Sequence, residues 1–158
     1  MEKYQKSIDL IFFTNNGETD QLTGAMAPNR FDQIVKRDLA ISDRSRSNLS
    51  MISITLDIAK FLATKVEQDS ALAISAIEDE LVKITFSLRS IFRESDCICR
   101  VSQLGFWIFF VSKTQSESAQ VIERAGKLLP LHCNVSISHR GVGEKQLDWY
   151  AKIDQIHF

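Results

Sequence analysis

Two stretches of the chain place hydrophobic residues at three- and four-residue steps, the spacing of one face of an α-helix. The first stretch follows Pro28 and consists of Phe31, Ile34, Val35 and Leu39. The second is longer and consists of Leu72, Ile74, Ile77, Leu81, Ile84, Leu88, Ile91 and Phe92. We expect an amphipathic helix at each stretch, and a further helix over about residues 116–128 that stops before Pro130.

Shorter apolar runs between these helices have the length and composition of β-strands. Leu49–Ile58 is apolar enough for a central strand, and Cys133–Ser138 predicts another. Cys97–Val101 and Phe106–Val111 flank a turn that is short enough for a hairpin. Near the end of the chain, residues 147–152 favour a helical turn or two, and residues 155–158 favour a terminal edge strand.

The order helix, strand, helix, hairpin, helix, strand is typical of an α/β (α+β) sandwich, with a central mixed β-sheet flanked by helices. At 158 residues and 17.9 kDa, the chain is most simply one domain. We expect that domain to span residues 20–158. Residues 1–19, with the apolar run Ile8–Phe13, are interpreted as an N-terminal segment that is either a strand or the remnant of a linker.

The charge balance limits the partners that the chain is expected to bind. A net charge of −1 argues against a nucleic acid polymer, because such binding relies on an excess of Lys and Arg. A small anionic ligand needs only two or three well-placed arginines and stays compatible with this charge. Ile8–Phe13 is too short for a signal-peptide core or a membrane span, so we expect a cytoplasmic protein without a membrane span.

Neither the cysteines nor the histidines have the spacing of a metal site. Cys97, Cys99 and Cys133 form no CxxC pair and lie in apolar, strand-like surroundings. The three histidines, at positions 132, 139 and 157, share no close spacing. We therefore expect small buried cysteines in a reducing compartment and no metal centre.

Six motifs follow one another along the chain in an order that resembles that of GGDEF domains, the fold of diguanylate cyclases. They are Asp20-Gln21-Leu22-Thr23-Gly24 with Pro28-Asn29-Arg30-Phe31, then Thr55-Leu56-Asp57-Ile58-Ala59-Lys60-Phe61, then Arg93-Glu94-Ser95-Asp96 with Arg100, then Val121-Ile122-Glu123-Arg124, Val135-Ser136-Ile137-Ser138 and Tyr150-Ala151-Lys152. The first three are similar to the family's D-x-L-T-G-L-x-N-R, D-I-D-x-F-K and R-x-x-D. The resemblance covers nearly the whole chain and implies a GGDEF or nucleotidyl-cyclase-like sandwich, with a hairpin at the signature.

The same resemblance implies that the signature is degenerate. It places Ser102, Gln103, Leu104, Gly105 and Phe106 on the family's G-G-D-E-F, and only the phenylalanine is kept. The cyclase joins two GTP molecules with the help of divalent metals that carboxylates hold.

Other positions that the family uses for catalysis also differ. Ala59 replaces the second aspartate of D-I-D, Lys65 falls near the guanine-reading asparagine, and no glycine precedes Glu78. Asp57 is kept, but a lone carboxylate at a strand end more often caps a helix or pairs with a lysine. We therefore expect no catalytic residues, no magnesium cofactor and a vestigial Asp57.

A second family site is kept in the sequence. In active members R-x-x-D binds the product, cyclic di-GMP, away from the active site, and here Arg93 and Asp96 match it. An arginine fork meets O6 and N7 of guanine, and a carboxylate suits its N–H donors. Arg124 matches a further arginine of that site. Arg37 resembles the arginine that a second subunit contributes when stacked ligand bridges two domains.

Three functions are consistent with these residues. The first is a non-catalytic cyclic di-GMP receptor that uses Arg93, Asp96, Arg124 and a partner's Arg37. The second is a structural module that forms a homodimer or docks another signalling protein and binds no nucleotide. The third is residual GTP binding or cyclase activity. In the simplest alternative to ligand binding, Arg93 caps its helix and Asp96 forms an exposed ion pair, which contributes little.

Overall fold

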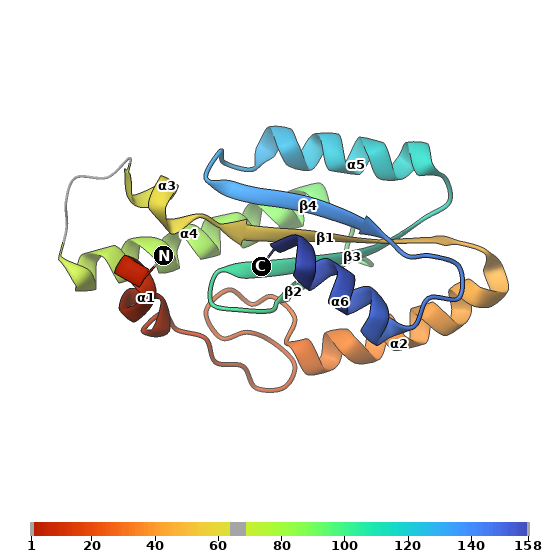
Figure 1. Ribbon diagram of the computed structural model, residues 1–158, viewed down its shortest axis with the longest axis horizontal. Coiled ribbons are helices and arrows are strands. Elements are labelled where there is room, and N and C mark those ends of the chain that lie inside the picture. The colour runs from red at the N-terminus through yellow and green to blue at the C-terminus, as the bar shows by residue number, and fades with distance from the viewer. Residues whose placement is uncertain (1, 64–68, 158) are drawn as a thin grey trace.

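The computed structural model describes residues 2–63 and 69–157, which form both helices and strands. In chain order they are α1 (Glu2–Asp9), α2 (Pro28–Ser45), β1 (Asn48–Leu56), α3 (Ile58–Ala63), α4 (Ser70–Ile91), β2 (Cys97–Arg100), β3 (Gly105–Ser112), α5 (Gln115–Leu128), β4 (Cys133–His139) and α6 (Gln146–His157) (Figure 1). The predicted α+β class is confirmed. The predicted hairpin is also confirmed, as β2 and β3.

The four strands form one sheet in the order β2-β3-β1-β4, and each neighbouring pair is antiparallel. The prediction of a mixed sheet was therefore wrong. The helix α4 carries the chain from β1 to β2 in the same direction, but β3 lies between these two strands and runs the opposite way, as in a split βαβ arrangement. The outer edge of β2 is bridged by Met26, whose N–H donates to the Ile98 carbonyl at 2.8 Å. β4 is the other edge.

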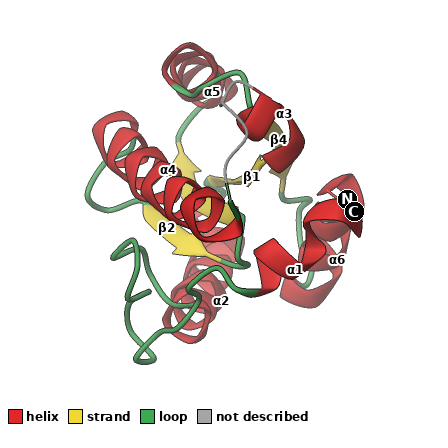
Figure 2. Ribbon diagram, turned by 90° about the vertical axis from the view of Figure 1, so that its left-hand side faces the viewer, coloured by secondary structure: helices red, strands yellow, loops and turns green. Residues whose placement is uncertain are grey.

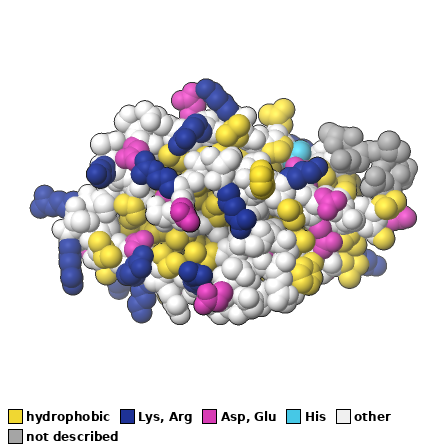
Figure 3. Space-filling view, turned by 180° about the vertical axis from the view of Figure 1, so that it is seen from behind, with side chains coloured by type: hydrophobic (Ala, Val, Ile, Leu, Met, Phe, Trp, Pro, Cys, Tyr) yellow, Lys and Arg dark blue, Asp and Glu magenta, His cyan; other side chains and the backbone are white. Residues whose placement is uncertain are grey.

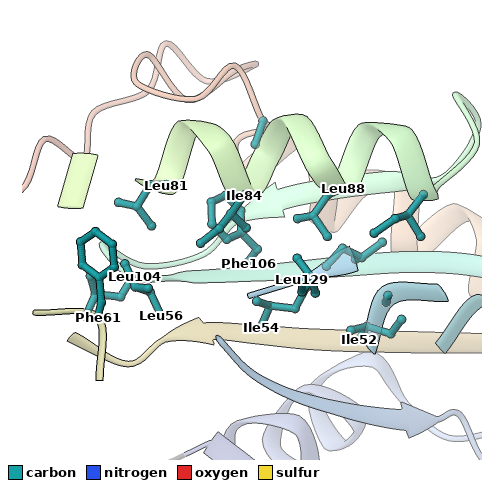
Figure 4. Close-up of a cluster of buried hydrophobic side chains, with 14 of the residues drawn as sticks. Ile52, Ile54, Leu56, Phe61, Leu81, Ile84, Leu88, Leu104, Phe106 and Leu129 are labelled. Atoms are coloured by element: carbon teal, nitrogen blue, oxygen red, sulfur yellow. The ribbon is translucent and has the colours of Figure 1, made fainter. Parts of the chain in front are cut away.

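Helices cover both faces of the sheet (Figure 2). On one face α4 and α5 bury a cluster that includes Ile84, Leu88 and Ala125 against Ile54 and Phe106 (Figure 4). On the other face α2 and α6 bury a second cluster, which includes Phe31, Trp149 and Ile153 together with Cys97 and Cys99. The two clusters follow from the alternation of side chains along β1.

Local sequence sets the ends of the longer helices. Asp69 caps α4 by accepting a hydrogen bond from the Leu72 N–H at 2.9 Å, and Thr114 caps α5 through the Glu117 N–H at 3.2 Å. Pro28 occupies the first position of α2, where its missing N–H is not needed. α2 ends at Arg46, which has a φ of 55°.

The structure corrects three of the predicted elements. Residues 155–157 belong to α6 and do not form an edge strand, because Trp149 and Ile153, one helical turn apart, are both buried in the second cluster. Residues 2–9 form α1 and not a strand, with Ile8 buried. The first predicted helix, whose apolar pattern ends at Leu39, continues to Ser45. The domain boundary between residues 19 and 20 stays a prediction. Within the described ranges, no helix is both long and apolar enough to cross a membrane.

Candidate functional site

Arg93 and Asp96 lie in the turn between α4 and β2 and hold that turn together. The Arg93 N–H donates to Asp96 Oδ2 at 2.8 Å, and the Asp96 N–H donates to the Arg93 carbonyl at 2.9 Å. The turn therefore places both side chains at the end of α4, as predicted. The aspartate carboxylate is engaged by the backbone of its own turn and not by the Arg93 guanidinium.

The Arg93 guanidinium reaches α5. Its Nη2 lies 3.0 Å from Glu117 Oε1, and 73% of the Arg93 side chain is exposed. Glu117 also accepts a hydrogen bond from the Lys113 N–H at 3.1 Å. An ion pair this exposed contributes at most about 1 kcal/mol to stability, so a ligand anion can displace Glu117 at little cost.

Arg124 lies on α5 beside the same turn. Together with Arg93, Asp96 and Glu117 it borders a depression of about 20 Å³, which is too small for a purine. The structure thus brings the three predicted residues together without leaving room between them for a base. Arg37, on α2, pairs with Asp38 at 3.0 Å and borders neither this depression nor the larger hollow described next.

A larger hollow of about 650 Å³ opens on the other side of Arg93 and Asp96. We call it the arginine hollow, because Arg30, Arg89 and Arg93 border it. The loop at residues 18–26, the start of α2, the end of α4 and the edge of β2 form its walls. Acidic side chains border it too, and Figure 3 shows Lys and Arg alternating with Asp and Glu on the face opposite the view of Figure 1.

Arg30 and Arg89 are held by the loop that forms one wall of this hollow. Arg30 pairs with Glu18 at 2.9 Å, and Arg89 Nη2 donates to the Gly24 carbonyl at 2.9 Å. Gly24 has a φ of 74°, and a Cβ there would lie 3.1 Å from Arg89 Nη2. Arg30 and Arg89 were not predicted as ligand contacts from the sequence, although Arg89 lies in the last turn of α4, four residues before Arg93.

Burial raises the pKa of the Asp96 carboxyl above its ordinary value, and the hydrogen bond from the Arg93 backbone lowers it by less. Ionised Asp96 therefore costs stability at neutral pH, and that cost disappears as the pH falls below the raised pKa. We expect Asp96→Asn to leave the free energy of unfolding equal or higher at neutral pH, because asparagine can still accept from the Arg93 N–H.

Urea denaturation of wild type and Asp96→Asn at neutral and acidic pH checks this prediction. The difference between the two proteins should shrink toward acidic pH. A clear loss of stability at neutral pH would show instead that the carboxylate is stabilised by a charged partner.

Residues 102–106, which the resemblance places on the family signature, lie at the turn of the hairpin, and the third of them is buried. Leu104 is 8% exposed and belongs to the cluster under α4 (Figure 4). Its carbonyl accepts a hydrogen bond from the Leu56 N–H at 3.0 Å, and the Val101 N–H donates to the Gly105 carbonyl at 3.0 Å. Leu104, which the resemblance aligns with an acid of the family signature, is a core residue in this chain.

The Ser102 side chain occupies the space beside Gly105 within the turn. A Cβ on Gly105 would lie 2.7 Å from Ser102 Oγ, closer than real Cβ atoms approach another heavy atom. A side chain at position 105 therefore requires Ser102 to rotate away or to be smaller. The family signature has a glycine at the first place and an acid at the fourth, which is the reverse of this arrangement.

The retained Asp57 caps the short helix α3. Its Oδ1 accepts from the Lys60 N–H at 3.1 Å, in agreement with the capping role expected of a lone carboxylate. Glu78 accepts from the Phe12 N–H at 2.9 Å, and Lys65 lies outside the described residues. Within the part of the chain that the structure describes, no three His, Cys, Asp or Glu side chains are placed to hold a metal ion.

The most deeply buried charges near the turn are Asp20 and Arg100. Arg100 Nη1 lies 3.0 Å from Asp20 Oδ1, and the side chains are 0% and 2% exposed. Arg100 also donates to the carbonyls of Phe12, at 2.7 Å, and Gln103, at 2.9 Å. This buried ion pair ties the N-terminal loop, β2 and the signature turn together. Both residues belong to motifs seen in the sequence, but their pairing was not predicted.

The fold was compared with known proteins. No protein-family model and no curated protein sequence matches the chain. Its structure is similar to the GGDEF domain of DgcB from Caulobacter crescentus in complex with c-di-GMP, with 14% identity, 90% of this chain and 88% of that chain covered, and a TM-score of 0.68. A sensory box/GGDEF family protein from Caulobacter crescentus CB15 has 19% identity, coverages of 87% and 94%, and a TM-score of 0.71.

A third similar structure is the diguanylate cyclase SiaD from Pseudomonas aeruginosa, in complex with its activator SiaC. Its identity is 17% and its TM-score 0.69, with 87% of this chain covered. The chain spans 55% of the SiaD chain, so SiaD contains much that has no counterpart here. Together with the topology and the ordered motifs, these similarities confirm the resemblance seen in the sequence at the level of fold: this chain folds as a GGDEF domain.

Proposed function

We propose that the chain is a receptor for cyclic di-GMP without cyclase activity, and that Arg93 and Asp96 read guanine. One observation carries the proposal. Both residues border a hollow of about 650 Å³, and two further arginines, Arg30 and Arg89, border it as well. Cyclic di-GMP combines guanine edges with two phosphodiesters, and guanidinium groups bind both.

The arrangement assigns different tasks to the residues. Arg93 exchanges its exposed contact with Glu117 for the O6 and N7 atoms of guanine, and Asp96 accepts from the N–H donors of guanine. Arg30 and Arg89 offer positive charge to the phosphodiesters inside the hollow. Arg124, which borders only the small depression, contributes where the ligand extends beyond the turn toward α5.

The residues at the catalytic positions of the family support the absence of cyclase activity. Phosphoryl transfer of this kind needs metals, and the metals need carboxylates. The signature offers the buried Leu104 and the side-chain-free Gly105, and Ala59 stands where the second aspartate is expected. Asp57 is already used as a helix cap.

Calorimetry with cyclic di-GMP tests the proposal. We expect wild type to bind and Arg93→Ala to lose about 1–3 kcal/mol of binding free energy, because a bidentate arginine contact to guanine is removed. The fold should be unaffected, since the contact of Arg93 with Glu117 is exposed. Lys127→Ala, on the same helix as Arg124, is the matched control and should bind as wild type does.

Failure of the wild-type protein to bind at micromolar concentration would favour a module that forms a homodimer or docks another protein. Two exposed apolar residues one turn apart on α4, Val82 and Phe86, suit such a contact. SiaD, which has a similar fold, was solved with a protein activator. Incubation with GTP and magnesium distinguishes the third possibility, residual cyclase activity, and we expect no product.

A further inference from the structure

A second hollow lies on the face of the sheet that α2 and α6 cover. It has a volume of about 270 Å³ and is bordered by β1, the start of α2, the end of α6 and the signature hairpin. We call it the acidic hollow, because Asp32 and Asp154 border it and no Lys, Arg or His among the described side chains does. Its volume approaches that of small-molecule sites.

The two carboxylates have unused hydrogen-bonding capacity. Asp32 Oδ1 accepts from the Tyr150 hydroxyl at 2.9 Å, while its Oδ2 accepts from no described residue. Asp154 makes no hydrogen bond or ion pair with any residue in the described ranges. Both aspartates are exposed, and no cationic side chain among the described lining residues balances their charges, which favours a positively charged occupant.

A buried hydroxyl in the same cavity points independently to a ligand. Ser53, in the middle of β1, is 3% exposed and borders the acidic hollow. Its Oγ has no hydrogen-bond partner among the described residues, whereas other buried serines, such as Ser112 and Ser118, bond to each other at 2.8 Å. Because Ser53 borders the hollow, an occupant of the hollow would supply the missing hydrogen-bond partner.

Aromatic side chains complete the walls. Phe31 and Trp107 border the hollow and are 1% and 9% exposed. Trp107 is fixed by an edge contact with Tyr150, at a centroid distance of 5.0 Å. An indole beside two carboxylates favours a cation that carries an apolar body, because the ring face attracts positive charge and the body gains buried area.

We infer that the acidic hollow binds a small organic cation, with a primary amine or guanidinium group on a short apolar body. The charged group is held by Asp32 and Asp154, the body lies against Trp107 and Phe31, and Ser53 bonds to a polar atom of the ligand. Nucleotides are disfavoured, because the hollow offers their phosphates two carboxylates and no cation. The inference does not depend on cyclic di-GMP binding in the arginine hollow.

Three molecules of nearly the same shape test the charge requirement. They are 2-phenylethylamine, which is cationic, 2-phenylethanol, which is neutral, and phenylacetate, which is anionic. We expect the amine to bind at millimolar concentration. Calorimetry and the NMR signal of the Trp107 indole N–H measure this binding. The alcohol should bind at least about tenfold more weakly, since it lacks the charge-assisted hydrogen bonds. The anion should not bind.

Variants test the named residues. Asp154→Asn and Asp32→Asn should each weaken binding of the amine by about tenfold, because asparagine keeps the shape and removes the charge. Asp148→Asn, on the same helix but outside the hollow, is the matched control and should have no effect. Asp154 has no hydrogen-bond or ion-pair partner among the described residues, so its variant should fold normally, and circular dichroism checks this.

Three results would overturn the inference. They are equal binding of the amine and the alcohol, no binding of the amine at millimolar concentration, and wild-type affinity in Asp154→Asn and Asp32→Asn. Any of them would indicate that the hollow holds only water. Arg93→Ala should bind the amine as wild type does, and Asp154→Asn should bind cyclic di-GMP as wild type does, so each proposal fails or survives separately.

Discussion

Asp20→Ala is expected to lower the free energy of unfolding by about 3–5 kcal/mol, because it leaves the buried charge of Arg100 without the carboxylate that balances it. Asp20 is the only carboxylate in contact with Arg100 within the described residues, at 3.0 and 3.2 Å. Burial lowers the pKa of Arg100, and Asp20 opposes this shift. The Arg100 Nε has no hydrogen-bond partner within the described ranges, so the guanidinium depends heavily on the aspartate.

Asp20 also organises the loop that precedes α2, which adds to the expected loss. Its Oδ2 accepts from the Thr23 N–H at 2.9 Å and from the Thr23 hydroxyl at 2.7 Å. The same loop carries Gly24 and forms a wall of the arginine hollow. We therefore expect Asp20→Ala to weaken cyclic di-GMP binding as well, although Asp20 does not border the hollow.

Urea denaturation measures the effect, with two controls. Glu123→Ala removes an exposed pair with Lys127 on α5 and should change stability by less than about 0.5 kcal/mol. The double variant Asp20→Ala/Arg100→Met should lose less than the sum of its single variants, because no buried charge remains unpaired. A loss below about 1 kcal/mol for Asp20→Ala would contradict the role of the buried ion pair.

Leu104→Asp is expected to destabilise the fold by more than Leu104→Ala, for which a loss of about 2–5 kcal/mol is typical of a buried leucine. The variant restores the acid of the family signature at its third place. It also puts a carboxylate into the apolar cluster under α4, where ionisation is costly. Leu104 is part of the core, so an acid at this position should destabilise the turn and should not supply a metal ligand.

Leu128→Asp is the matched control, because Leu128 is 55% exposed on α5. Its effect on the free energy of unfolding should stay within about 0.5 kcal/mol. The loss in Leu104→Asp should shrink at acidic pH, since burial raises the pKa of a carboxyl and protonation removes the charge. If Leu104→Asp unfolded at the same urea concentration as wild type, position 104 would have to face solvent.

The sequence could predict the structure of those elements whose hydrophobic residues follow a long periodic pattern. The apolar residues of α4 recur every three or four positions, which indicates a helix, and the continuous apolar run of β1 indicates a strand. Both elements were predicted within a few residues. α1 was missed because its eight residues bury few apolar side chains, and Ile8 is the clearest of them. The end of α6 was missed because the burial of Trp149 and Ile153 depends on α2 and β4, which sequence pattern does not reveal.

The candidate site shows the same limit. Arg93 and Asp96 contact each other within one short turn, so their proximity follows from their spacing in the sequence. Glu117, which occupies the Arg93 guanidinium, is 24 residues away on another helix, and the partner of Arg100 is 80 residues away. The walls of both hollows come from four or more separate segments each. Only the packing of these segments could bring their side chains together.

The unequal edges of the sheet bear on how copies of the chain would associate. Met26 bridges the outer side of β2, accepting from the Arg100 N–H at 3.2 Å, so that edge is closed to a further strand. β4 has no such cover within the described residues, and Val135 on it is 39% exposed. Unpaired strands recruit other strands. Pairing of sheets between two molecules would therefore take place at β4. Because each sheet has only this one open edge among the described residues, such pairing would produce a dimer and no larger assembly.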